Sequence, residues 1–367
     1  MADANDTPPD RAVAPRAKIW ATRRLWPGLL GAAALGLALS LALFVYWKGL
    51  DALPGASGKV TFFLIGTGST SGTYFPVGEA LAAVISHPPG AAPCEQGEHC
   101  GVPGLIAVVK SAAGSVANAR QVNAGHLDSA LVQANVLARA FKGTGEFAGE
   151  GSQSALRAIA GLYPEAVHLV VARQAGITKI ADLKGKRVSI GPKGSGTQTD
   201  AKHILRAYGL RSQQLKMIEA DVSRSEQMIL TGELDAFFLV TGAPARSIAE
   251  LSARGVIDLL PIDGAPADRL RLEYPFYTPW EIAGETYQGI GAVNTLSIGA
   301  VWVTHEQTDP DLIYRITKAL FDPSNRKILQ SAHPKGYFIT RETAAQGVPI
   351  LLHPGAERYY REAGILP

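Results

Sequence analysis

Val60-Thr-Phe-Phe-Leu-Ile-Gly-Thr-Gly-Ser-Thr-Ser-Gly72 joins an apolar segment to a loop of glycine and small hydroxyl residues. The apolar part, Val60 to Ile65, predicts a buried strand. Pro76, three residues after a run of small polar residues, predicts the start of a helix. A strand, a glycine-rich loop and a helix in this order are typical of an α/β unit with a parallel sheet. Ligands bind such sheets at the carboxyl ends of the strands, so this loop is a candidate for ligand binding.

The same pattern returns in the second half of the chain. Ile190-Gly-Pro-Lys-Gly-Ser-Gly-Thr197 follows a predicted strand and precedes a helix that ends near Tyr208. A second pair of segments also matches in design: Gly125-His-Leu-Asp-Ser-Ala-Leu-Val-Gln133 and Gly232-Glu-Leu-Asp-Ala-Phe-Phe-Leu-Val-Thr241. Two related α/β lobes explain this repetition better than one continuous domain, and facing lobes would bring their loops together in a central cleft.

The two aspartates of the second pair, Asp128 and Asp235, lie at the starts of predicted strands, opposite the cleft, and we interpret them as structural. Ser223 is the predicted N-cap of a helix that ends at Gly232. The remaining predicted elements are strands at Leu105 to Lys110, Asp128 to Val132, Val167 to Ala172, Leu215 to Glu219 and Asp235 to Val240, and helices at Val116 to Ala124 and from Gln133 through Phe141.

The N-terminal region has the character of a membrane leader. Residues 1–24 form a basic tail, 25–47 contain no charged residue, and 48–58 form a linker containing Gly, Pro and Ser. About 20 apolar residues cross a bilayer as a helix, and basic residues keep their end in the cytoplasm. We therefore expect a signal-anchor that leaves the rest of the chain on the periplasmic face of the inner membrane. A cleaved signal peptide is the alternative, and it places the rest of the chain in the same compartment.

The only two cysteines, Cys94 and Cys100, lie in a loop rich in Gly and Pro. An oxidising compartment favours a disulfide between them. A metal site that uses both cysteines and His99 is the alternative, but no fourth ligand is evident.

Composition and motifs exclude several functions. The formal net charge is +3 and no basic run follows residue 59, which argues against nucleic-acid binding. The glycine loops match neither of the two standard nucleotide-binding patterns, and the sequence has no metalloprotease helix motif and no nucleophile elbow. We therefore predict a protein that is not an enzyme and that needs no cofactor or metal.

Several segments resemble the TAXI family of solute-binding proteins from tripartite ATP-independent (TRAP) transporters. They are Gly66-Thr-Gly-Ser-Thr-Ser-Gly-Thr-Tyr74, Gly114-Ser-Val-Ala-Asn118, Ala158-Ile-Ala-Gly-Leu-Tyr-Pro-Glu-Ala-Val-His168, Ile180-Ala-Asp-Leu-Lys-Gly-Lys-Arg-Val-Ser-Ile-Gly-Pro-Lys-Gly-Ser-Gly-Thr197 and Leu352-His-Pro-Gly-Ala-Glu-Arg-Tyr-Tyr360.

The resemblance implies a type II periplasmic-binding-protein fold whose two lobes are joined by crossover strands. Lobe 1 would comprise residues 59–168 and 298–367, and lobe 2 residues 169–297. It also implies a small carboxylate or amino-acid ligand, such as glutamate or 2-oxoglutarate, and a TRAP-type permease as the partner in the membrane. Members of the family are usually released by signal cleavage, so the anchor expected at 25–47 departs from the family pattern.

Helix N-termini present unpaired backbone N–H groups to an anion, and glycines let the anion approach them closely. On this basis the predicted ligand-binding residues are Gly68, Ser69, Ser71, Tyr74, Ser115, Gln133, Asn135, Lys193, Ser195, Gly196, Thr197, Gln198 and Thr241.

Two other functions use the same features of the sequence. A membrane-anchored sensor or scaffold would bind a ligand with the same lobes and report it to a neighbouring membrane protein. An exported hydrolase would need a nucleophile and a base close together, and the sequence shows no such arrangement.

Overall fold

The computed structural model describes residue 40 and residues 60–92 and 100–367. Residues 58–367 form one compact unit. The predicted tail, membrane segment and linker lie almost entirely outside the described residues, as do Cys94 and His99, so the anchor and the disulfide stay predictions. No helix within the described residues is long and apolar enough to cross a bilayer.

The strands of the unit form one large sheet and one small sheet. The large sheet contains β1 (Thr61–Gly66), β4 (Leu105–Lys110), β5 (Ser129–Gln133), β6 (Leu156–Ala172), β7 (Arg187–Ser189), β8 (Lys216–Ile218), β9 (Ala236–Thr241), β10 (Ile257–Leu260), β11 (Thr278–Ile282) and β12 (Val293–His305). Its strand order is β4-β1-β5-β12-β6-β9-β7-β8, with β10 beside β6 and β11 beside β12. The small sheet pairs β2 (Ser86–His87) with β3 (Val102–Pro103).

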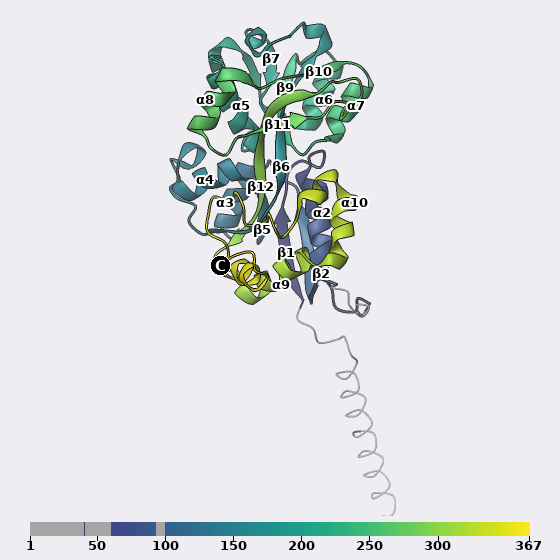
Figure 1. Ribbon diagram of the computed structural model, residues 1–367, viewed down its shortest axis with the longest axis vertical. Coiled ribbons are helices and arrows are strands. Elements are labelled where there is room, and N and C mark those ends of the chain that lie inside the picture. The colour runs from purple at the N-terminus through teal and green to yellow at the C-terminus, as the bar shows by residue number, and fades with distance from the viewer. Residues whose placement is uncertain (1–39, 41–59, 93–99) are drawn as a thin grey trace, which may run out of the picture. The chain divides into compact units, whose positions relative to one another are not determined.

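The large sheet has the same design in its two halves (Figure 1). Strand β1 lies parallel to β4 and β5, and β7 lies parallel to β8 and β9. A fourth strand runs antiparallel to each group: β12 beside β5 and β6 beside β9. The long strands β6 and β12 also pair with each other, so they join the two halves of the sheet. The repetition in the sequence therefore corresponds to two α/β lobes connected by two crossing strands.

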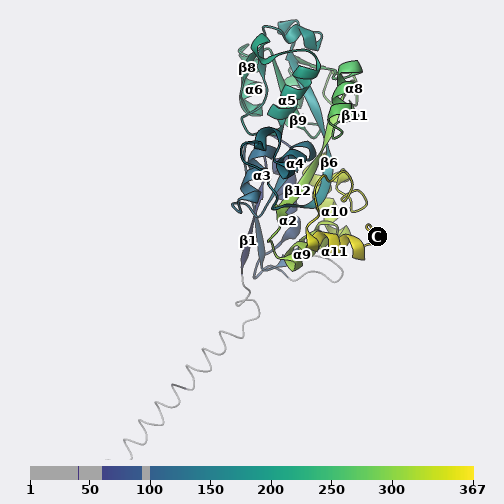
Figure 2. The ribbon, with the colours of Figure 1, turned by 90° about the vertical axis from the view of Figure 1, so that its left-hand side faces the viewer.

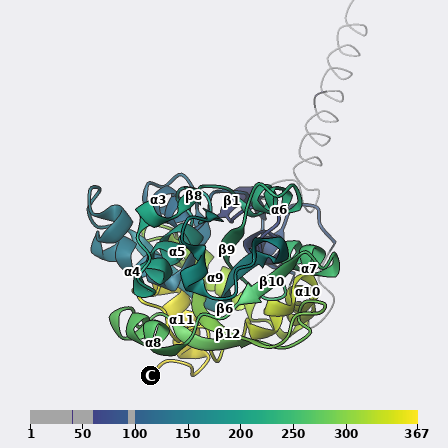
Figure 3. The ribbon, with the colours of Figure 1, turned by 90° about the horizontal axis from the view of Figure 1, so that it is seen from above.

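The helices cover both faces of the sheet. They are α2 (Tyr74–Ile85), α3 (Ser115–Asn123), α4 (Ala134–Lys142), α5 (Gly196–Ala207), α6 (Val222–Leu230), α7 (Arg246–Ala253), α8 (Gly264–Glu273), α9 (Pro310–Leu320), α10 (Arg326–Ala332) and α11 (Pro354–Glu362). Short 3₁₀ helices are η1 (Gly145–Phe147), η2 (Arg173–Ala175), η3 (Ile180–Leu183), η4 (Ser212–Gln214), η5 (Pro323–Asn325) and η6 (Pro334–Phe338). Helices α4, α5 and α8 lie on one side of β6 and β9, and α7 and α10 lie on the other (Figures 1 and 3).

We call the strands β1, β4 and β5, with helices α2–α4 and α9–α11, lobe 1. The strands β7–β10, with helices α5–α8, are lobe 2. Figure 2 shows β6 and β12 running from one group to the other. The boundaries predicted for the lobes stay a prediction, because β6 and β12 belong to both.

The two aspartates of the repeat have the structural role predicted for them. The carboxylate of Asp128 accepts a hydrogen bond from the backbone N–H of Leu64 at 2.7 Å. The carboxylate of Asp235 accepts one from the backbone N–H of Arg187, also at 2.7 Å, and pairs with the Arg187 guanidinium. Each aspartate therefore ties the strand that follows it to the first strand of its own lobe, so the pseudo-symmetry extends to single hydrogen bonds.

Two sequence predictions need correction. Asp221, not Ser223, is the N-cap of α6, because the Asp221 side chain accepts a hydrogen bond from the backbone N–H of Arg224. The strand predicted at Val167 to Ala172 is only the second part of β6, which begins at Leu156. The earlier part lies inside lobe 1 and pairs with β12 at its full length.

Candidate ligand-binding site

Four helix N-termini, two from each lobe, meet around one cavity. The residues that precede the helices are Thr73 before α2, Gly114 before α3, Ser195 before α5 and Asp221 before α6. All four line a cavity of about 90 Å³. The strands that precede these helices run in opposite directions in the two lobes, so their carboxyl ends point toward each other and the helix starts converge between the lobes.

Eight of the predicted ligand-binding residues line this cavity. They are Gly68, Ser69, Tyr74, Ser115, Ser195, Gly196, Thr197 and Thr241.

The other five predicted residues have other positions. Ser71 lies at the mouth of the cleft, where its hydroxyl is 2.6 Å from the hydroxyl of Ser223 in lobe 2. The Lys193 side chain is exposed and does not line the cavity. Lys193 was predicted as a ligand-binding residue because of its charge, but its side chain lies in solvent.

The three predicted amide side chains are buried beside the cavity and do not line it. Asn135 donates to the Asp200 carboxylate at 2.5 Å, and Gln198 donates to the Glu219 carboxylate at 2.7 Å. Gln133 packs so closely on Gly196 that a Cβ atom on the glycine would overlap its side-chain oxygen. That oxygen is buried and accepts no hydrogen bond within the described part of the chain.

The cavity offers backbone N–H groups instead of cationic side chains. Within the described residues, no acceptor faces the backbone N–H of Ser115, Gly196 or Thr197. Unpaired N–H groups at a helix start carry partial positive charge and favour an anion. No Lys, Arg or His is among the lining residues. The cavity can therefore bind an anionic group by charge-assisted hydrogen bonds from the backbone.

Sequence reasoning missed Glu165, which contributes a carboxyl group to the cavity. This side chain from β6 is 2% exposed, and its Oε2 accepts a hydrogen bond from the Tyr74 hydroxyl at 2.8 Å. Burial raises the pKa of Glu165 to about 8, although the hydrogen bond from Tyr74 acts in the opposite direction. It is the only acidic residue of β6, a strand made mostly of apolar residues, and this was the signal that could have identified it.

A buried lysine lies close enough to influence Glu165. The Lys335 ammonium is 4.7 Å from the centres of both the Trp280 and the Phe338 rings, which is within cation–π range. Burial lowers the pKa of Lys335 to about 8, and the charge of Glu165 acts against that decrease. The two groups form no ion pair, because no Lys335–Glu165 contact within 4.0 Å occurs in the described residues.

Several hydrogen bonds connect the two lobes near the cavity. The hydroxyls of Thr73 and Thr241 lie 2.9 Å apart, and the backbone N–H of Thr73 also donates to the Thr241 hydroxyl. The backbone N–H of Ala117 donates to the carbonyl of Gly194 at 3.1 Å. Thr73 and Thr241 line the cavity, so separation of the lobes would open it.

A larger groove of about 670 Å³ adjoins the cavity and shares Gly72 and Thr73 with it. Its walls come from both lobes: α2 and α10 on one side, α6 and α7 on the other. Ser71 is one of the residues that line this groove, and its contact with Ser223 joins the two lobes there.

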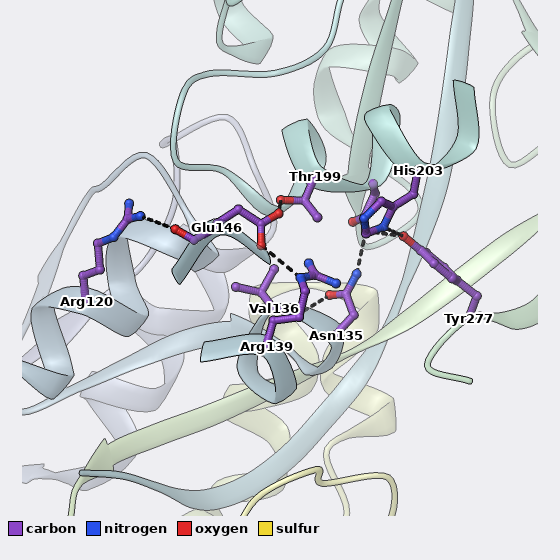
Figure 4. Close-up of polar contacts among 9 residues, drawn as sticks. Arg120, Asn135, Val136, Arg139, Glu146, Thr199, His203 and Tyr277 are labelled. Atoms are coloured by element: carbon purple, nitrogen blue, oxygen red, sulfur yellow. Dashed lines mark hydrogen bonds and ion pairs between the residues drawn. The ribbon is translucent and has the colours of Figure 1, made fainter. Parts of the chain in front are cut away.

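A buried polar cluster connects the two lobes (Figure 4). One oxygen of Asp200 in α5 accepts hydrogen bonds from Asn135 of lobe 1 and from the Tyr277 hydroxyl at 2.6 Å. Burial raises the pKa of Asp200 to about 7. His203, one turn along α5, is 3.3 Å from the same Tyr277 hydroxyl and stacks on Tyr274. Burial lowers the pKa of His203 to about 4, so it is neutral at physiological pH.

Glu146 continues this cluster within lobe 1 (Figure 4). Its carboxylate pairs with Arg139 at 2.9 Å and accepts a hydrogen bond from Thr199 of lobe 2, while its backbone carbonyl accepts one from Arg120. The cluster thus adds charged and neutral hydrogen bonds across the boundary between the lobes.

A metal site has no support from the described residues, in which no three His, Cys, Asp or Glu side chains are grouped to hold an ion. The alternative site of Cys94, His99 and Cys100 falls largely in residues 93–99, outside the described part.

Comparison with known protein families gives a match over residues 65–364, to the NMT1-like family. This chain belongs to the NMT1-like family. The match covers both lobes and both crossing strands, so the family and the fold are established for the same part of the chain.

Solved structures with this two-lobed α/β fold are similar at low sequence identity. MatC from Rhodopseudomonas palustris with bound malate has a TM-score of 0.50 and 10% identity, over 84% of this chain and 99% of that chain. The alkanesulfonate-binding protein SsuA from Xanthomonas axonopodis pv. citri, bound to MOPS, has a TM-score of 0.41 and 14% identity, over 85% and 86%. An ABC uptake transporter substrate-binding protein from Streptococcus pneumoniae with bound histidine has a TM-score of 0.42 and 12% identity, over 74% and 92%. The likeness to MatC confirms the predicted α/β fold with two lobes.

Proposed function

We propose that this protein is an extracytoplasmic solute receptor that binds a small carboxylate between its lobes. The observation that carries the proposal is the convergence of four helix N-termini from both lobes on one cavity without a cationic side chain in its walls. Such a site recognises a carboxylate through backbone N–H groups. It needs both lobes, so ligand binding favours their closed arrangement.

The size of the cavity limits the ligand. A volume of about 90 Å³ is smaller than the roughly 150 Å³ that accommodates benzene in an apolar protein cavity. A compact carboxylate fits this space, and a longer one would extend toward the groove that shares Gly72 and Thr73.

The finer parts of the proposal come from the sequence. The five segments that resemble TAXI proteins support delivery of the ligand to a TRAP-type permease, and the apolar residues 25–47 support anchoring at the periplasmic face of the inner membrane. Deletion of the gene should abolish uptake of the ligand by intact cells. Normal uptake without this protein would contradict the transport role and would favour the membrane-anchored sensor.

Thermal-shift screening of the purified full chain against amino acids, dicarboxylates and tricarboxylates tests the binding function. A ligand present at 100 times its Kd stabilises the folded state by about 2.7 kcal/mol, which is readily measured as a rise in Tm. If no carboxylate in the panel raises Tm, the protein is not a receptor of this kind.

A matched pair of glycine variants locates the binding site. Gly68→Leu should abolish the shift, because its side chain would project at the cavity while its Cβ atom meets Tyr74 at an ordinary 3.7 Å. Gly291→Leu is the control, since a Cβ atom there has no neighbour within 4 Å. If the ligand raises Tm equally in both variants, it does not bind in this cavity.

A further inference from the structure

We propose that Glu165 accepts the ammonium group of the ligand, which makes the preferred ligand a zwitterionic amino acid with a short side chain. This inference rests on the proposed function and specifies its ligand class. It follows from two kinds of polar groups within the cavity: backbone N–H donors at the helix starts and the buried carboxyl group of Glu165 on the crossing strand. The second acidic residue in the lining, Asp221, is exposed and accepts a hydrogen bond from the backbone N–H of Arg224 as the N-cap of α6.

The position of Glu165 distinguishes it from a structural carboxylate. It lies on β6, which belongs to both lobes, and its side chain is almost completely buried while it lines the cavity. The Tyr74 hydroxyl donates to Oε2 at 2.8 Å. The other oxygen, Oε1, accepts no hydrogen bond from any described residue, and it is not among the fully enclosed atoms that lack a partner. This oxygen is therefore available to a group in the cavity.

The charge balance of the site favours a cation at this position. A buried carboxylate is costly without an opposite charge, and Glu165 has no ion-pair partner among the described residues. The nearby ammonium of Lys335 is held over two aromatic rings instead. An ammonium group supplied by the ligand would provide the missing charge and would form a strong, charge-assisted hydrogen bond.

The opposite end of such a ligand matches the rest of the cavity. The carboxylate of an amino acid would accept hydrogen bonds from the backbone N–H groups of Ser115, Gly196 and Thr197, which have no acceptor in the described structure. At pH 8 and above, where Glu165 is ionised in a large fraction of the molecules, a dicarboxylate would place its second negative group beside this carboxylate. The small volume further favours an amino acid of the size of alanine or serine.

Alanine and lactate form a matched pair of ligands for the test, because they differ mainly in the replacement of ammonium by hydroxyl. We expect isothermal titration calorimetry of the full chain at pH 8 to give a Kd at least about tenfold lower for L-alanine than for L-lactate. Glu165→Gln keeps an oxygen that accepts from Tyr74 but removes the negative charge. It should weaken alanine binding at least about tenfold and leave lactate binding within about threefold, since loss of one partner of a buried charge pair costs affinity strongly.

The exposed Glu281→Gln variant should leave both affinities unchanged. If wild-type protein binds lactate as tightly as alanine or more tightly, the inference is wrong while the receptor function stands. If Glu165→Gln affects both ligands equally, the carboxylate does not recognise the ammonium group. If the protein binds neither ligand nor any other carboxylate, both the inference and the proposed function fail.

Discussion

Asp200 should make the stability of the protein depend on pH, and Asp200→Asn should remove that contribution. Both hydrogen bonds to Asp200 survive the change, because the single asparagine oxygen can accept from Asn135 and from Tyr277 as Oδ1 of the carboxylate does. The variant therefore isolates the charge. Burial raises the pKa of Asp200 from 3.8 to about 7.

The direction of this pH dependence follows from the protonation of Asp200 in the folded and unfolded states. Above pH 3.8 the unfolded state releases the proton of this carboxyl while the folded state keeps it up to about pH 7, so stability falls as the pH rises between these values. At about 1.4 kcal/mol per pH unit, the cost is roughly 1.5 kcal/mol at pH 5 and roughly 4 kcal/mol at pH 8. The difference between the two pH values is thus roughly 2.5 kcal/mol.

Urea unfolding of the wild type and of Asp200→Asn at pH 5 and pH 8 measures this difference directly. The free energy of unfolding of the variant, relative to that of the wild type, should increase by roughly 2.5 kcal/mol between pH 5 and pH 8. The Asp268→Asn variant changes an exposed residue and serves as the control. Its free energy of unfolding should depend on pH as that of the wild type does. Equal pH dependence in the wild type and Asp200→Asn would show that Asp200 is not the buried, protonated group described here.

Three other substitutions test separate parts of the structure. Thr241→Val removes the hydroxyl that bonds to lobe 1 across the cavity and should weaken ligand binding about 5- to 30-fold in calorimetry, whereas unchanged binding would show that this cross-lobe contact does not contribute. Gly336→Ala should lower the free energy of unfolding by roughly 3 kcal/mol, because its Cβ would overlap the Leu329 carbonyl. The control, Gly149→Ala, should leave the free energy of unfolding unchanged, since a Cβ atom there has no neighbour within 4 Å. Similar urea midpoints for the two variants would refute this close packing. Asp128→Ala removes the carboxylate that accepts from the backbone of β1 and should cost about 1–2 kcal/mol in urea unfolding, so a neutral effect would contradict its structural role.

Much of the fold could be predicted from the sequence because its signals are local. The apolar run Val60 to Ile65 and the loop that follows it correspond to β1 and the start of α2. Gly125 and Gly232 both have left-handed backbone, with φ of 70° and 71°, as their matching positions in the repeat predict. The small-residue loops were also found, because a loop between a strand and a helix has a recognisable composition at the sequence level.

The parts that the sequence did not predict depend on contacts between distant residues. Glu165 and Tyr74 are 91 residues apart, and Asp200 and Tyr277 are 77 residues apart. No local pattern indicates that these side chains meet. Asn135 was predicted to bind the ligand because it lies at a predicted strand end, but its side chain donates to Asp200 and does not line the cavity. This contact also joins residues that are distant in the sequence.

The proposed receptor function depends on the position of a bound carboxylate. A crystal structure of the full chain with the tightest carboxylate found by screening would test it most directly. We predict that the carboxylate lies between the lobes and accepts hydrogen bonds at 2.7–3.2 Å from the backbone N–H groups of Ser115, Gly196 or Thr197. A ligand bound elsewhere, or one held between the lobes without any backbone N–H contact, would contradict it.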